Sequence, residues 1–250
     1  MLLICGPCVI ENEKTLMNTA RSINSVIKKI KNVDFYFKAS CIKDNRTKLD
    51  NYYGPGFEEG LRLLEKVSTT FNVKITTDFH DVDQINHYGY RVDLIQIPAF
   101  LAMQTSIINA AVKRNVPLHI KKPQSLSPFN IGNIVNKVFE LNENAELMIT
   151  DRGTSFGFDY LIMDPRFIRV MQNATVYKFK VLTDVTHPNK YWRNYTYAYD
   201  LAKSSVVCGT DGLFIECHID PENALCDADS QIPAKELKSL LKSCGVANNA

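Results

Sequence analysis

Apolar runs and polar clusters alternate along the whole chain. Eight runs rich in Val, Ile, Leu and Phe predict strands, and each ends in a cluster of polar, glycine or proline residues; they span 2–5, 35–38, 73–76, 92–97, 118–120, 147–150, 176–182 and 212–215. Apolar positions three and four apart predict helices between them. The expected helices span 12–31, 56–67, 82–87, 101–114, 128–141, 165–171, 197–207 and 235–241. This order of elements is typical of a parallel sheet buried on both faces.

The length of the chain favours a closed sheet. The chain has 250 residues, the usual size of one (β/α)₈ barrel, and no Gly/Ser/Pro-rich linker divides it. An open doubly wound sheet shares the same alternation and is the structural alternative. Because all eight strands end in polar clusters, we predict an α/β fold of the (β/α)₈ TIM-barrel type, with residues 1–250 forming a single domain.

The polar clusters carry most of the residues capable of chemistry. In a closed barrel the loops after all eight strands meet on one face, which is where such enzymes hold their active sites. The cations at these strand ends are Lys38, Lys43, Arg46, Lys121 and Arg152. Polar neighbours that can share their ligand are Ser40, Asn45, Gln96 and Gln124. Lysine and arginine are the usual readers of phosphate and carboxylate, so we predict a ligand that carries both groups.

A second cluster has the composition of a metal site. Cys8 follows the first strand, His187 the seventh, Glu216 lies at the eighth, and Asp227 lies in the loop beyond it. The first, seventh and eighth strands are neighbours in a closed barrel, so these side chains can meet around a divalent transition metal. Mixed S, N and O donors accept zinc, iron, manganese or cobalt and do not distinguish them. The alternative is a buried free cysteine beside an unrelated histidine, because these four residues do not form a short-spacing zinc motif.

Charge and cysteine usage exclude several classes of function. The formal net charge is only +2, and the basic residues at 28–31 end an amphipathic helix, so we expect no nucleic-acid partner. The apolar first ten residues lack a basic start and contain Gly6 and Pro7, which predicts a strand and neither a signal peptide nor a membrane span. Seven cysteines, an odd number without the density of a disulfide scaffold, favour the cytosol.

Two histidines are expected to have structural roles. His119 lies inside an expected strand, so we predict a core histidine with a hydrogen-bond partner. His87 lies in an expected helix, where we predict a surface position.

At these clusters the chain resembles the 3-deoxy-D-manno-octulosonate 8-phosphate synthases. The most specific matching segments are 37–47, 96–101, 121–124, 151–157, 184–187 and 220–227, and the resemblance runs from Gly6 to Pro233. It implies a homotetrameric (β/α)₈ barrel that condenses phosphoenolpyruvate with D-arabinose 5-phosphate.

The resemblance also implies roles for individual residues. The phosphoenolpyruvate site would comprise Lys38, Ser40, Lys43, Gln96, Lys121 and Arg152. Asn45 and an Arg46 from a neighbouring subunit would reach the sugar phosphate, and Asp78 the sugar. Cys8, His187, Glu216 and Asp227 match the metal-dependent branch of the family. We therefore expect the reaction itself to depend on Lys38, Lys43, Asp78, His187 and Asp227.

Two alternatives stay open, and departures from the family pattern motivate the first. The long loop that usually follows His187 is shortened here, which predicts a less covered site, and Tyr53 stands where the family has arginine. A catalytically inactive barrel that binds metal or phosphoester is therefore one alternative. Another is a sibling phosphoenolpyruvate-dependent synthase, of the DAHP type that uses erythrose 4-phosphate or of the sialic acid type that uses an amino sugar.

Overall fold

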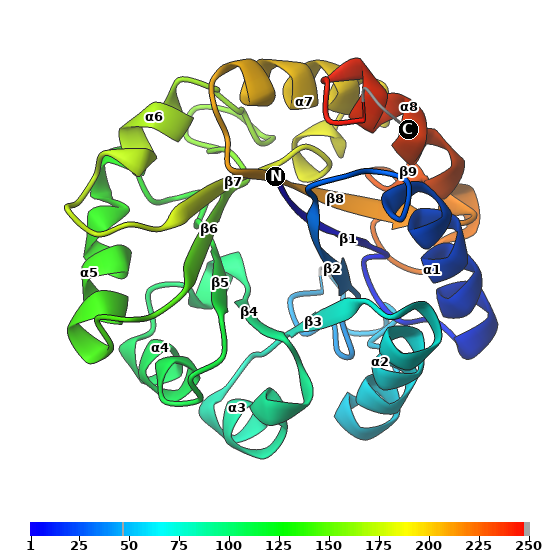
Figure 1. Cartoon of the computed structure of the whole chain (residues 1–250), viewed down its shortest axis with the longest axis horizontal. Helices are drawn as coiled ribbons and strands as arrows, with labels where there is room; N and C mark the ends of the chain where they lie inside the picture. The colour runs from blue at the N-terminus through cyan, green and yellow to red at the C-terminus, as the bar shows by residue number, and fades with distance from the viewer. Residues whose placement is uncertain (47, 248–250) are drawn as a thin grey trace.

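The computed structural model of the protein describes residues 1–46 and 48–247; Thr47, in the 37–47 motif, and the last three residues lie outside it. Eight parallel strands follow one another in chain order, and β1 also pairs with β8, which closes the barrel predicted from the sequence (Figure 1). The strands are β1 (Leu2–Gly6), β2 (Asp34–Lys38), β3 (Lys74–Asp78), β4 (Leu94–Ile97), β5 (Leu118–Lys121), β6 (Leu147–Asp151), β7 (Lys180–Asp184) and β8 (Gly212–His218).

Helices form an outer ring around the strands (Figure 1). They are α1 (Glu13–Ile27), α2 (Phe57–Phe71), α3 (Val82–Tyr88), α4 (Thr105–Val112), α5 (Gly132–Leu141), α6 (Phe167–Gln172), α7 (Tyr197–Val207) and α8 (Leu237–Ser243). In α1 the apolar stripe from Leu16 to Ile27 is buried against the sheet, and the Asn12 side chain caps the helix by accepting from the Thr15 amide. Within the described residues no helix is long and apolar enough to cross a bilayer.

Several predicted boundaries were wrong. The first two helices were expected to end at 31 and 67 but end at Ile27 and Phe71. The seventh strand was expected at 176–182 but spans Lys180–Asp184, because its pairing with β6 starts at Lys180 and Val176 before it is exposed. The helices expected from residues 101 and 128 begin as α4 at Thr105 and α5 at Gly132. Single 3₁₀ turns, Ala99–Leu101 and Pro128–Asn130, occupy the expected starts, where proline precedes or opens the turn.

Strand alternation places polar side chains inside one end of the barrel. Successive side chains of a strand point to opposite faces, so every second residue faces the barrel interior. The interior cluster toward the strand starts is apolar and contains Leu2, Ile4, Tyr36, Leu94, Met148, Leu182 and Phe214. Two residues further along five of these strands stand Lys38, Gln96, Thr150, Asp184 and Glu216, all buried. The apolar layer therefore closes one end of the barrel, and these five polar residues line the chamber next to it.

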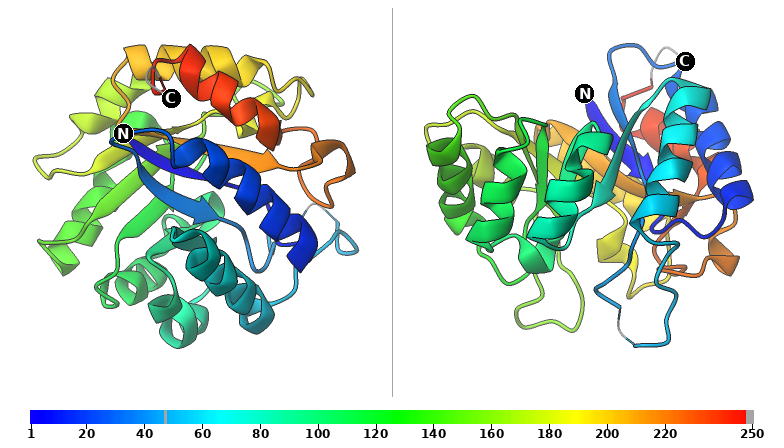
Figure 2. Two further views of the ribbon diagram at one scale, coloured as in Figure 1. Left: turned by 45° about the vertical axis from the view of Figure 1, so that its right-hand side comes forward. Right: turned by 90° about the horizontal axis from the view of Figure 1, so that it is seen from below.

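The loops after the strands extend this chamber beyond the sheet. The long loops after β2 and β6 project from the end of the barrel opposite the N-terminus (Figure 2). The short strand β9 (Ile232–Pro233) continues the pairing of β8 at Cys217 and His218 and carries the loop with Asp227 back toward β1. Cys8, in the loop after β1, and Asp227 are thereby brought to the same place.

Candidate active site

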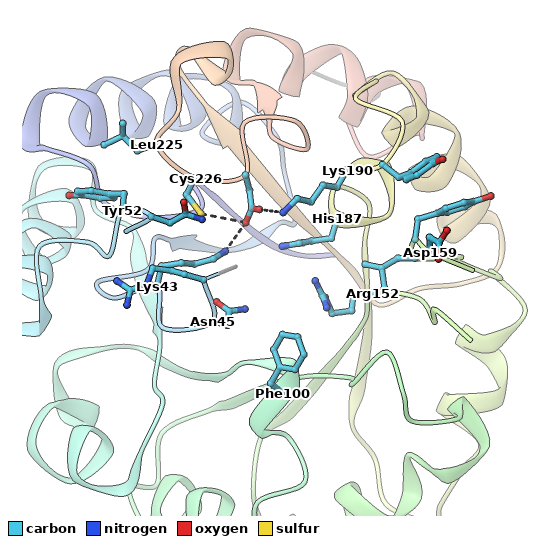
Figure 3. Close-up of a pocket in the computed structure, with 16 residues that line it drawn as sticks. Lys43, Asn45, Tyr52, Phe100, Arg152, Asp159, His187, Lys190, Leu225 and Cys226 are labelled. Atoms are coloured by element: carbon cyan, nitrogen blue, oxygen red, sulfur yellow. Dashed lines mark hydrogen bonds and ion pairs between the residues drawn. The ribbon is translucent and has the colours of Figure 1, made fainter. Parts of the chain in front are cut away.

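A cavity of about 540 Å³ opens at the carboxyl end of the barrel. Six of the predicted site residues line it, as Figure 3 shows for the labelled ones: Lys43, Asn45, Arg46, Arg152, His187 and Asp227. Arg152 also approaches Gln124, with 3.3 Å between Nη1 and Oε1. Seven other predicted residues are buried: Cys8, Lys38, Ser40, Asp78, Gln96, Lys121 and Glu216.

Asp78 is the acceptor at the centre of the buried hydrogen bonds. Ser40 Oγ donates to its Oδ2 at 2.7 Å, and the Gln96 amide nitrogen donates to its Oδ1. Burial opposes ionisation of this carboxyl, but the ammonium groups of Lys121 and Lys38 outweigh it and hold the pKa of Asp78 well below its usual range. Asp78 is therefore a fixed anion that accepts two hydrogen bonds.

The hydrogen bonds continue to His119 and define its tautomer. Since the Gln96 nitrogen donates to Asp78, its Oε1 must accept from His119 Nδ1, 2.9 Å away. His119 Nε2 then accepts from the Thr150 hydroxyl at 2.6 Å. Burial and Lys121 lower the pKa of His119 to about 3, so the ring is neutral at pH 7. The predicted core histidine is confirmed, and His87 is exposed as expected.

The lysines of the interior differ in their partners. Lys38 Nζ lies 3.1 Å from Glu216 Oε1 and 2.8 Å from the Cys8 carbonyl oxygen. Burial lowers its pKa, but Glu216, Asp78 and Cys8 together more than offset this, so Lys38 stays charged. Lys121 Nζ lies over the ring of Phe214, 4.3 Å from its centroid, and burial lowers its pKa.

Successive side chains at the end of β5 point to opposite sides, so Lys121 and its neighbour Lys122 have different surroundings. The Lys122 ammonium donates to the carbonyl oxygens of Pro123 and Gly153 and lies 3.4 Å from Asp151. Lys122 therefore links the loops after β5 and β6 through hydrogen bonds, whereas Lys121 belongs to the interior chamber.

His187 and Glu216 each have a potential metal-binding atom that faces the other residue. Asp184 Oδ2 lies 2.5 Å from His187 Nδ1 and fixes the ring, while its Oδ1 accepts from the backbone amides of Thr186 and His187. His187 Nε2 is left facing Glu216 Oε2 at 3.8 Å. That carboxylate oxygen is buried and has no hydrogen-bond partner among the residues that the structure describes. A carboxylate behind a histidine is the usual support of a metal-binding imidazole.

Asp227 joins two groups of potential metal donors. One group comprises Cys8, Cys226 and Asp227, and the other His187, Glu216 and Asp227. The four residues predicted from the sequence are thus brought together, but as two groups that share one carboxylate.

Two lysines neutralise Asp227. Lys43 Nζ lies 2.7 Å from Oδ2 and Lys190 Nζ 2.6 Å from Oδ1, and their dashed lines meet on this carboxylate in Figure 3. Burial opposes its ionisation, but Lys43, His187 and Lys190 hold the pKa of Asp227 well below its usual range. Lys43 also lies 3.0 Å from Cys8 Sγ.

Arg46 lines the cavity of its own chain and stacks on Tyr53. Its guanidinium carbon lies 4.5 Å from the Tyr53 ring centroid. Tyr53, whose effect the sequence left unassigned, therefore fixes this arginine beside the cavity.

The short loop after β7 packs against the loop after β6 through aromatic side chains. The Tyr160 and Tyr191 rings lie 4.5 Å apart, Trp192 packs edge-on against both, and the two tyrosines line the cavity. This aromatic wall covers one side of the mouth.

Four residues of the site were not found from the sequence. Asp184 could have been found, because it lies three residues before His187 at a strand end. Thr150, Lys190 and Cys226 contact site residues only through the closure of the barrel and the loop folds, and no local pattern marks them.

Comparisons with known proteins agree with this geometry. The model of the DAHP synthetase I family matches residues 1–247. The chain belongs to this family.

Within the family, the chain is similar to proteins named 2-dehydro-3-deoxyphosphooctonate aldolase. The protein of Syntrophotalea carbinolica is 39% identical over 250 residues, covering 96% of this chain and 88% of the relative. That of Cronobacter sakazakii is 38% identical over 248 residues, covering 96% and 86%. That of Desulfatibacillum aliphaticivorans is 36% identical over 249 residues, covering 96% and 89%. The resemblance inferred from the motifs is confirmed.

His119 gives this member of the DAHP synthetase I family a predictable pH dependence. Between its ordinary pKa of 6.5 and its folded value of about 3, only the unfolded chain protonates this ring. The unfolded state then binds more protons, so the free energy of unfolding falls as the pH decreases, by up to about 1.4 kcal/mol per pH unit from this group. His119→Gln should flatten this slope in urea titrations at about pH 7, 6 and 5. The exposed-site control His87→Gln should not, and equal slopes for both would contradict a buried neutral His119.

Proposed function

We propose that this protein joins C3 of phosphoenolpyruvate to the aldehyde carbon of D-arabinose 5-phosphate, while water adds at C2 and inorganic phosphate leaves. The product is 3-deoxy-D-manno-octulosonate 8-phosphate, which makes the protein an aldol-type transferase. The observation that carries this proposal is the shared name of relatives that match nearly the whole chain. The cations around and beneath the cavity support it, since both substrates are phosphorylated.

The charges of the chamber suit phosphoenolpyruvate. Arg152 and Lys43 line the cavity, and Lys121 and Lys38 lie beneath it, so cations are available on two levels for a phosphate and a carboxylate. Ser40 and Gln96 would complete this site. Fixed groups of this kind offset the substrate's charge without reorganising during the reaction.

The sugar phosphate is assigned to Asn45 and Arg46 at the outer side of the cavity. A stacked guanidinium keeps its planar donors oriented, which suits bidentate contact with phosphate. Asp78 is assigned to the sugar. Gln124 is assigned to substrate binding because its side chain contacts Arg152. A homotetramer in the cytoplasm is part of the proposal, with Arg46 of a neighbouring subunit expected at the sugar phosphate, although within the single chain Arg46 lines its own cavity.

The residues present fit a divalent transition metal. Cys8, His187, Glu216 and Asp227 would hold it, and the buried Glu216 Oε2 without a partner supports this. Such an ion, whether zinc, iron, manganese or cobalt, would polarise the aldehyde or position the water. Lys43, whose ammonium lies between Cys8 and Asp227, would be free to turn toward the substrates when these donors hold an ion.

The first experiment measures phosphate release from phosphoenolpyruvate with each aldose phosphate in turn. We expect a kcat/KM for arabinose 5-phosphate at least about tenfold above that for erythrose 4-phosphate, because the Lys43 to Arg46 loop matches the octulosonate pattern. Arg46→Ala should raise the KM for the sugar phosphate by about tenfold or more, with little change for phosphoenolpyruvate. Comparable kcat/KM values for the two sugars would assign the protein to the sibling synthases, and no turnover would identify an inactive barrel.

The second experiment removes the metal. Chelator should abolish activity, and Mn²⁺, Fe²⁺ or Co²⁺ should restore it, because metal binding requires ionised Cys8 and neutral His187. Elemental analysis of the purified protein should find about one ion per chain, and Cys8→Ala should lose it. Full activity in chelator, with no metal in the untreated protein, would make Cys8 a structural thiol.

A further inference from the structure

A second thiol lies beside the proposed metal ligands. Cys226 Sγ is 3.4 Å from Cys8 Sγ and 3.7 Å from Asp227 Oδ2, while Cys8 Sγ is 3.1 Å from the same oxygen. The three donor atoms form a triangle with one carboxylate and two sulfurs. Cys226 follows no zinc motif in the sequence, and its place results only from the fold of the loop after β8.

Buried Gln231 holds the two cysteine segments together. Its side-chain oxygen accepts from the Cys8 amide at 3.0 Å, and its side-chain nitrogen donates to the Cys226 carbonyl at 2.8 Å. The loop turns sharply at Asp227, whose φ is +48°, and its carbonyl accepts from the amides of Ser230 and Gln231. The spacing of the two thiols is therefore set by the backbone rather than by chance contact of mobile side chains.

The distances suit one ion between the three atoms. With zinc–sulfur bonds of about 2.3 Å and zinc–oxygen bonds of about 2.1 Å, tetrahedral coordination separates two sulfurs by about 3.8 Å and a sulfur and an oxygen by about 3.6 Å. The observed distances of 3.1, 3.4 and 3.7 Å approach these values. Shifts of a few tenths of an ångström, together with displacement of the Lys43 ammonium, would complete the geometry.

We propose that Cys226 supplies a second thiolate to the metal bound at Cys8 and Asp227. This inference depends on the proposed function in one respect, namely that the site holds a metal ion. Cys226 and Asp227 line the cavity while Cys8 is buried behind them, so an ion entering from solvent meets Cys226 and Asp227 first. Two thiolates select for thiophilic ions, so the site prefers Zn²⁺ or Co²⁺ over Mn²⁺.

The test is the absorption of the full-length protein loaded with one equivalent of Co²⁺ in the presence of a phosphine reductant. Each thiolate bound to cobalt contributes a charge-transfer band in the near ultraviolet. Cys226→Ser should lower the intensity per bound cobalt to about half, and its ratio of zinc to manganese affinity should fall, because one of two soft ligands is lost. The matched control is Cys208→Ser, a half-buried cysteine at the end of α7, which should keep the full band.

The outcomes separate this inference from the proposed function. If Cys226→Ser keeps the full band and metal selectivity while Cys8→Ser loses the band, Cys226 is not a ligand and the four-residue site stands. If the unmodified protein binds no cobalt, both the metal site and the role of Cys226 are overturned, whereas turnover of phosphoenolpyruvate is judged separately by phosphate release. Halving in Cys226→Ser alone supports the second thiolate.

Discussion

The pairing of opposite charges inside a closed barrel is the constraint on which the site depends. A lysine or carboxylate removed from water is stable only beside compensating groups. Here Lys38 is paired with Glu216, and Lys43 with Asp227. Asp78 is held ionised by Lys121 and Lys38 together, although burial opposes it. The chamber can therefore keep several charges fixed and dehydrated before any substrate arrives.

Asp227 connects this charge pairing with the proposed metal chemistry. The same carboxylate accepts from Lys43 and Lys190 and belongs to both groups of metal donors. Binding of an ion would thus change the partners of two lysines at the cavity wall. Asp227 would therefore couple metal binding to substrate binding, because lysines released from this carboxylate become available to anionic ligands.

Sequence reasoning succeeded where the chemistry follows a local period. The alternation of strands and helices and the polar strand ends predicted the barrel, and the resemblance assigned Lys121 to the phosphoenolpyruvate site. The structure places Lys121 in the interior chamber, whereas Lys122 links two loops. It was less successful where long-range packing decides: β7 begins at Lys180 because of its pairing with β6. The stacking of Arg46 on Tyr53 and the approach of Cys226 to Cys8 depend on loops that only the closed fold brings together.

We propose that phosphoenolpyruvate is held by the interior strand-end cations rather than by basic residues near the site in general. The most direct test is calorimetric binding of phosphoenolpyruvate to Lys121→Met and Lys122→Met, since these adjacent lysines have the same charge but different places. Lys121→Met should weaken binding by about tenfold or more, the loss expected for a charge-assisted contact. Lys122→Met should bind with nearly unchanged affinity and instead unfold at lower urea concentration. Equal losses of affinity in the two variants, or none in Lys121→Met, would contradict this proposal.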